Sequence, residues 1–174
     1  MFEFLKKKAI PSQPVNLKNK KRKNLIGNTQ IAFEPGLIDS FIEEHKILIS
    51  KFTKLELSVK TKQAKVVKEA LSIFSKLLRA HLLKENLKLY VYLRHATSHD
   101  PSSSEVIIQY KKEMHEIGKT VHDFVTHYLS LNLNAEELKE MDDQLPHIKA
   151  LLIQRITDEE ETLYPLYMIP ENYF

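Results

Sequence analysis

Two residues that can bind a metal interrupt the apolar face of a predicted long helix in the middle of the chain. Between residues 67 and 92, apolar side chains recur every three or four positions, which is the period of one helix face. His81 and Glu85 occupy two positions of this stripe. An uncompensated buried carboxylate costs several kcal/mol, so Glu85 must be paired, protonated or bound to a metal.

The first and last predicted helices carry polar residues on their apolar faces as well. His45 lies on the stripe of the first helix, and Arg155 and Glu159 lie one turn apart on the stripe of the last. Taken alone, a histidine such as His45 is more often a hydrogen-bonded core residue than a ligand. His81 and Glu85, four residues apart on one helix, can reach an ion at the axis of a bundle, and His45 can reach it from the next helix.

The two halves of the chain repeat this arrangement. "EEHKIL" (43–48) aligns with "EMHEIG" (113–118), and "HLLKENLKLYVYL" (81–93) aligns with "RITDEEETLYPLY" (155–167). The paired positions, 70 or 74 residues apart, are His45 with His115, His81 with Arg155, and Glu85 with Glu159. The sequence therefore predicts an internal repeat of a helical hairpin.

The third predicted helix offers two histidines, His115 and His122, on the stripe that flanks its apolar face. Each is a candidate ligand, and the alternative for each is a partly exposed, hydrogen-bonded side chain. The flanking position leaves both roles open.

Composition favours one all-α domain. The 174 residues are 43% hydrophobic and 28% charged, with only three glycines, whereas strands and hairpins demand more glycine. There is no cysteine, which excludes disulfides and thiolate metal sites, so metal ligands must be histidine and carboxylate.

Four long helices joined by short links predict an antiparallel, up-down-up-down bundle. Ser102 with Glu105, and Asn134 with Glu137, are predicted to cap helix starts. Pro146 is predicted to begin the last helix. The predicted segments are 37–57, 63–95, a helix from the 102–105 cap to about 131, a short segment 134–144, and 146–163.

Residues 1–34 are predicted to form a basic, flexible arm, and residues 35–174 the bundle. Residues 1–24 hold eight Lys or Arg against Glu3 alone. The arm is a solvated tail or a contact for nucleic acid, an acidic membrane surface or an acidic protein. No apolar run is long enough to cross a bilayer and the first residues do not follow the order of a secretion signal, so we expect a cytoplasmic protein.

The repeat resembles the hemerythrin family, in its HHE cation-binding branch, over about residues 35–168. The resemblance rests on "EEHKIL", "HLLKENLKLY" and "EEETLYPLY". It implies a four-helix bundle in which both halves hold non-haem iron, up to a di-iron centre, without enzymatic activity, to bind O2 or to sense O2, NO or redox state. The matching ligand positions are His45, His81, Glu85, His115 and Glu159, with His122 as an additional candidate.

Arg155 departs from this pattern, because it stands where the family offers a histidine and a guanidinium cannot bind iron. It supplies a fixed charge that can compensate Glu85 and Glu159. We therefore expect one ion or a labile pair, with iron, another divalent cation or no metal left open. The alternative is a metal-free bundle that binds a protein partner, since "RITDEEETLYPLY" is similar to the last helix of Rsd and AlgQ, regulators of the bacterial housekeeping sigma factor.

Overall fold

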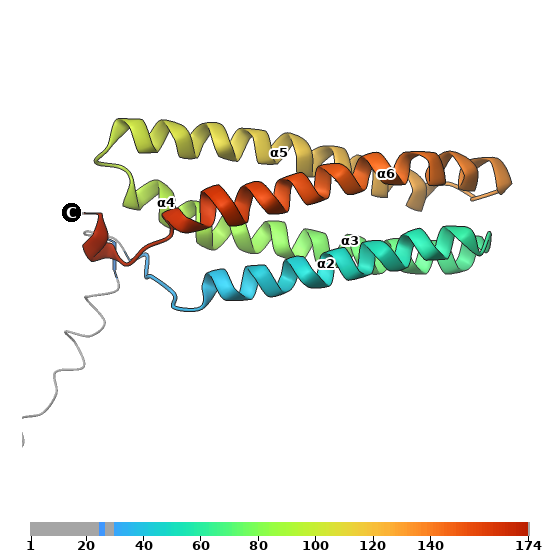
Figure 1. Ribbon diagram of the computed structural model, residues 1–174, viewed down its shortest axis with the longest axis horizontal. Helices are drawn as coiled ribbons and strands as arrows, with labels where there is room; N and C mark the ends of the chain where they lie inside the picture. The colour runs from blue at the N-terminus through green and yellow to red at the C-terminus, as the bar shows by residue number, and fades with distance from the viewer. Residues whose placement is uncertain (1–24, 27–29, 174) are drawn as a thin grey trace, which may run out of the picture.

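The computed structural model describes residues 25–26 and 30–173. Its helices run alternately in opposite directions, with one helical hairpin lying over the other (Figure 1). The predicted all-α bundle of four long helical arms is confirmed. The elements are α2 (Leu37–Lys60), α3 (Ala64–Lys84), the π-helical turn η1 (Glu85–Leu89), α4 (Tyr90–Ala96), α5 (Pro101–Ser130), α6 (Ala135–Asp158), the π-helical turn η2 (Glu159–Leu163), and the 3-10 turns η3 (Tyr164–Leu166) and η4 (Pro170–Asn172).

The fourth long helix, α6, begins earlier than predicted and is not interrupted. Asn134 and Glu137 form the predicted capping box, but α6 continues from there through Pro146 to Asp158. The predicted break near Gln144 is therefore wrong. Buried apolar residues on both sides of the proline pack into one core and hold the helix together although one backbone hydrogen bond is lost.

The start of α5 also differs from the prediction. Asp100, rather than Ser102, is the N-cap, and its carboxylate accepts hydrogen bonds from the backbone N–H groups of Ser102 and Ser103. Pro101 occupies the first helical position, where its missing N–H costs nothing. The predicted Ser102 and Glu105 capping box is thus wrong.

Ile26, Ile31, Phe33 and Glu34, which we assigned to the arm, contact the bundle. Ile26 is only 1% exposed, and the Phe33 ring stacks on Tyr167 with 4.9 Å between the ring centroids. The backbone N–H of Glu34 donates to the Tyr167 hydroxyl at 2.8 Å. Residues 1–24, where most of the predicted basic arm falls, lie outside the described residues.

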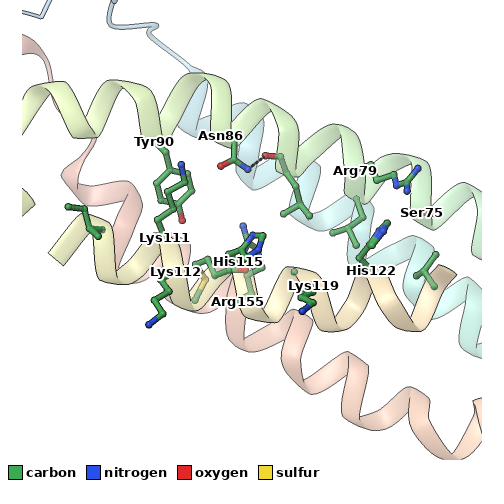
Figure 2. A pocket seen from close by; sticks show the side chains of 16 residues that line it. Ser75, Arg79, Asn86, Tyr90, Lys111, Lys112, His115, Lys119, His122 and Arg155 are labelled. Atoms are coloured by element: carbon green, nitrogen blue, oxygen red, sulfur yellow. Dashed lines mark hydrogen bonds between the residues drawn. The ribbon is translucent and has the colours of Figure 1, made fainter. Parts of the chain in front are cut away.

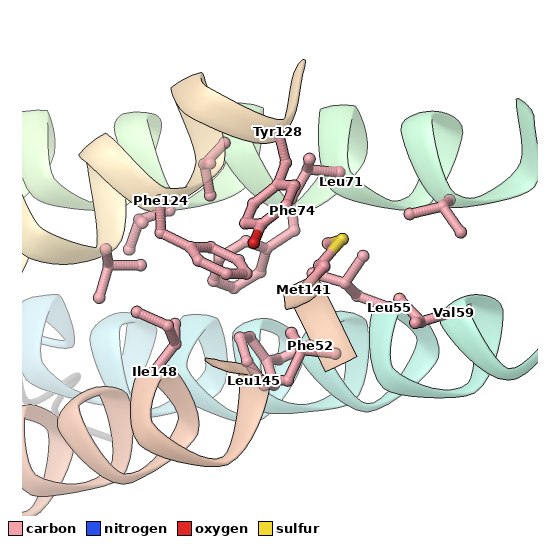
Figure 3. Close-up of a cluster of buried hydrophobic side chains, with 14 of the residues drawn as sticks. Phe52, Leu55, Val59, Leu71, Phe74, Phe124, Tyr128, Met141, Leu145 and Ile148 are labelled. Atoms are coloured by element: carbon pink, nitrogen blue, oxygen red, sulfur yellow. The ribbon is translucent and has the colours of Figure 1, made fainter. Parts of the chain in front are cut away.

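Two apolar cores lie at the two ends of the bundle. The larger core fills the end near the α2–α3 and α5–α6 connections, and Figure 3 shows its aromatic centre around Phe52, Phe74, Phe124 and Tyr128. The smaller core contains Phe41, Leu89, Leu163 and their neighbours. Along each of α2, α3 and α6, polar buried residues separate the two cores. None of the described helices is both long enough and apolar enough to cross a membrane.

Phe74→Ala should lower the free energy of unfolding by about 3–5 kcal/mol, because it leaves a cavity in the larger core. The Phe74 ring is fully buried and packs edge-on against the Phe52 ring, with 5.3 Å between the ring centroids. The control is Ile73→Ala, one residue earlier on the same helix and 48% exposed, which should change stability by less than about 1 kcal/mol. Urea denaturation measures both, and equal losses would show that α3 buries a different face.

Candidate metal centre

Four of the predicted ligands meet in the polar layer between the two cores. His45 comes from α2, His81 from α3, Glu85 from η1 and Glu159 from η2, and all four are at most 3% exposed. One donor atom from each lies within 4.8 Å of all the others. In the part of the chain that the structure describes, this is the group of histidines and carboxylates able to hold a metal ion.

The spacing of the donor atoms suits a single ion. The Nε2 atoms of His45 and His81 are 3.1 Å apart, His45 Nε2 is 3.2 Å from Glu159 Oε2, and His81 Nε2 is 3.8 Å from Glu85 Oε1. Two nitrogen ligands about 2.0–2.1 Å from a tetrahedral ion lie about 3.3 Å from each other. The four side chains are therefore already close to the positions in which they could share one cation.

Each histidine is oriented by a carboxylate on its outer nitrogen. His45 Nδ1 lies 2.7 Å from Glu160 Oε1, and His81 Nδ1 lies 2.9 Å from Glu44 Oε2. Glu44 is itself held by Lys84, whose Nζ is 2.5 Å from Glu44 Oε1. With Nδ1–H donating outward, the lone pair of each Nε2 points to the centre, which is the usual arrangement around metal-binding histidines.

Two inward lone pairs 3.1 Å apart require a cation between them, either a proton or a metal ion. Burial by itself lowers the pKa of both histidines. At His45, the adjacent carboxylates of Glu159 and Glu160 outweigh burial, so the His45 pKa is raised, whereas burial prevails at His81 and its pKa is lowered. Without metal, the proton between the rings therefore belongs to His45.

Arg155 holds the outer sides of both carboxylates. Its Nη2 is 2.6 Å from Glu85 Oε2 and 2.6 Å from Glu159 Oε1, and its Nη1 donates to the Met114 carbonyl. Burial lowers the Arg155 pKa, but the two carboxylates raise it by a larger amount. The net pKa lies above its ordinary value, so the guanidinium stays charged. Arg155 leaves Glu85 Oε1 and Glu159 Oε2 facing the histidines, where they could bind a cation.

Glu159 is a buried acceptor that the protein satisfies only in part. Both of its oxygens lie within ion-pair distance of a cationic group, yet neither has a hydrogen bond of good geometry to another described residue. Buried carboxylates rarely remain in this state. A cation between Glu159 and the histidines would satisfy Oε2, so the residues present fit a metal ion.

The hydroxyl of Tyr164 closes one side of the centre. It donates to Glu85 Oε1 at 3.2 Å and lies 3.2 Å from His45 Nε2. Burial and the Glu85 charge raise the Tyr164 pKa far above its ordinary value, so the phenol stays protonated. This contact, like those of Glu44 and Glu160, was not predicted from the sequence. The two glutamates could have been noticed, since they directly precede His45 and follow Glu159.

Each of the two buried carboxylates of the candidate centre begins a π-helical turn. The turns Glu85–Leu89 and Glu159–Leu163 occupy equivalent places in the repeat, 74 residues apart. In each, the backbone N–H of the following tyrosine, Tyr90 or Tyr164, bonds to the carbonyl of the glutamate five residues earlier. Such turns within α-helices are frequent at functional sites.

The other predicted ligands do not join the centre. His115 is exposed and His122 is half-buried. Both line a pocket between α3 and α5, with His115 beside Arg155 (Figure 2). The two halves therefore share their helical backbone and the buried glutamate, Glu85 or Glu159. The histidine of the second half, His115, lies outside the cluster.

A helical bundle whose inner faces bring two histidines and two glutamates together falls in the class of metal-binding helical bundles. The hemerythrin HHE cation-binding domain matches residues 36–167, and the chain belongs to this family. Neither a curated protein nor a solved structure matches the chain significantly.

His81→Ala should abolish metal uptake, because it removes one of the two nitrogen ligands. Leu78→Ala, one turn away on α3, is the control. It should retain metal but lose about 2–5 kcal/mol of folding stability, since Leu78 is a buried core residue. Elemental analysis and urea denaturation of both variants test this, and full metal retention by His81→Ala would overturn the ligand assignment.

Metal binding should release at least one proton near neutral pH, because the raised His45 pKa keeps a proton where the ion must sit. Below the His45 pKa, apparent metal affinity should then fall about tenfold for each pH unit of acidification. Calorimetry in two buffers with different ionisation enthalpies counts the released protons. Affinity that does not change between pH 5 and 8 would show that His45 is not a ligand.

Proposed function

We propose that this protein binds one non-haem iron ion at His45, His81, Glu85 and Glu159, and that it uses the ion to sense O2, NO or redox state rather than to catalyse turnover. The observation that supports this proposal most directly is the pair of histidine Nε2 atoms, which lie 3.1 Å apart while both Nδ1 atoms contact carboxylates. Membership of the hemerythrin HHE family supports a cation at this place. Imidazole and carboxylate ligands together suit iron(II), manganese(II) or zinc.

The charges around the centre favour one divalent ion over two. Glu85, Glu159 and Glu160 face Arg155 and the two histidines, while Glu44 is neutralised separately by Lys84. Three carboxylates and one guanidinium carry a net charge of −2, which one divalent ion cancels. A second divalent ion would leave an uncompensated +2 in a buried layer, which is costly.

A small pocket lies on the outer side of His81, where Nδ1 meets Glu44. It has a volume of about 220 Å³ and is lined by His81, Glu44, Lys84 and apolar residues of α2 and α3. Bound iron would supply a redox-active centre with coordination positions for a diatomic ligand. The protein residues would hold the ion and orient both imidazoles, and the Tyr164 hydroxyl would donate to Glu85 Oε1.

Protein loaded anaerobically with iron(II) should contain one iron per chain by elemental analysis. Added NO should produce the electron paramagnetic resonance signal of an iron(II)–nitrosyl, and His81→Ala should give neither result. Two tightly held irons per chain would overturn the single-ion proposal. A chain that takes up no iron, zinc or manganese would favour a metal-free role.

That second candidate, a metal-free bundle that binds a protein partner, is favoured by one observation. Arg155 already bridges Glu85 and Glu159 at 2.6 Å, as a compensating cation would. The two candidates differ in whether another cation can take over this task.

Arg155→Met should destabilise the metal-free protein by about 3–5 kcal/mol, because it leaves two buried carboxylates without their cation. If the centre binds metal, added iron(II) or zinc should restore part of this loss. The control is Lys149→Met, which breaks a partly exposed ion pair with Glu56 and should cost less than about 1 kcal/mol. Destabilisation by Arg155→Met that no metal relieves would support the metal-free candidate.

A further inference from the structure

A second, larger pocket lies between α3–α4 and α5, on the other side of Arg155 from the metal centre. Its volume is about 520 Å³, which is within the range of small-molecule sites. Along α5 it extends from Ile108 to Val125, a span of about 25 Å at 1.5 Å per residue. Figure 2 shows Tyr90, Lys111 and Lys112 at one end and Ser75 and His122 at the other. The pocket is therefore elongated.

The rim of this pocket is basic. Arg79, Lys111, Lys112 and Lys119 line it and are exposed. None of the sixteen described lining residues is Asp or Glu. Within the part of the chain that the structure describes, no carboxylate forms an ion pair with these four side chains. Four cations around a low-dielectric hollow attract an anion.

The interior of the pocket is largely apolar, although the buried Arg155 also lines it near Gly118. Leu78 and Leu82 of α3 face Met114 and Val125 of α5 across it. Gly118 widens its centre, where an added Cβ would lie 3.6 Å from Leu82 Cδ1, an ordinary contact distance. No close contact therefore demands glycine at this mid-helix position, and its effect is to leave space. The pocket thus combines cations at its rim with an apolar body.

A buried hydroxyl without a partner lies at one end of this hollow. Tyr90 is 4% exposed, lines the pocket, and its hydroxyl has no hydrogen-bond partner among the described residues. Its repeat equivalent, Tyr164, donates to Glu85 in the metal centre. The Lys111 ammonium lies 5.6 Å from the centre of the Tyr90 ring. Tyr90 thus offers an unused donor beside a cation.

We propose that this pocket binds an aliphatic carboxylate. The carboxylate accepts a hydrogen bond from the Tyr90 hydroxyl and lies beside Lys111 and Lys112, and the apolar chain extends past Leu82 and Leu78. The elongated shape, the basic rim and the unpartnered hydroxyl each favour this ligand over a compact or neutral one. The site lies on the other side of Arg155 from the metal centre, shares that residue with it, and does not depend on metal being bound.

Decanoate is the probe, titrated into the full chain by isothermal titration calorimetry. Decanol and decyltrimethylammonium share its apolar chain but lack the negative charge, and acetate has the charge without the chain. Decanoate should bind at one site per chain and at least tenfold more tightly than each of the three. Equal binding of decanoate and decanol, or no binding of decanoate at millimolar concentration, would overturn the proposal.

Variants of the head-group end locate the carboxylate. Tyr90→Phe should weaken decanoate binding about tenfold, because it removes a hydrogen bond to a charged group. It should leave thermal stability unchanged or slightly higher, since the hydroxyl has no partner in the free protein. The double variant Lys111→Met and Lys112→Met should weaken binding further, whereas the control, Lys65→Met and Lys139→Met outside the pocket, should not. Unchanged affinity in Tyr90→Phe would overturn the assigned position of the carboxylate.

Gly118 variants test whether the ligand occupies the hollow itself. Gly118→Ala adds a Cβ that fits and should bind decanoate normally, while Gly118→Leu fills the space and should reduce affinity at least tenfold. Circular dichroism shows whether both variants fold. If Gly118→Leu does not fold, the decanoate affinity of Tyr90→Phe tests the location of the ligand instead. Normal binding by a folded Gly118→Leu would place decanoate elsewhere.

Discussion

Two carboxylates held away from water, between two apolar cores, set the constraint on which the rest of the bundle depends. Glu85 and Glu159 are fully buried, and each would cost several kcal/mol if left uncompensated. Arg155 compensates their outer oxygens, and the inner oxygens face the histidines. The polar layer divides the hydrophobic interior, because apolar residues can pack only above and below it. The layer is stable only with a cation at its centre, which is a proton on His45 or a metal ion.

Much of this could be predicted from spacing alone, because helix periodicity fixes which residues share a face. His45, His81 and Glu159 stood on apolar stripes, and burial followed from that position. The outer partners could not be predicted in the same way, since Glu160 lies on a half-exposed face that suits a solvated charge equally well. His115 was predicted as a ligand, but its side chain lies outside the centre. The repeat predicted its position on the helix, but the direction of its side chain depends on packing between helices, which a sequence pattern does not contain.

The two halves of the repeat have taken different chemical roles. In the first half, His81 is buried, and Tyr164 from the opposite hairpin donates a hydrogen bond to Glu85. In the second, the corresponding positions hold Arg155 and Tyr90, and the space around them is open as a basic pocket. Arg155 belongs to both regions, since its guanidinium pairs with the carboxylates on one side and lines the pocket on the other. Substitution of this single residue therefore changes both sites at once.

The two π-helical turns make chain length as important as residue identity. In an uninterrupted α-helix, residues five apart differ in direction by about 140°, so a tyrosine five residues after a buried glutamate would face elsewhere. A π turn accommodates one additional residue, which brings Tyr90 and Tyr164 back toward the interior. Adding one further residue within 160–163, beyond the one that the π turn already accommodates, would rotate the following segment by about 100° relative to the preceding one. Such an insertion would disturb the centre more than most substitutions, although every candidate ligand would still be present.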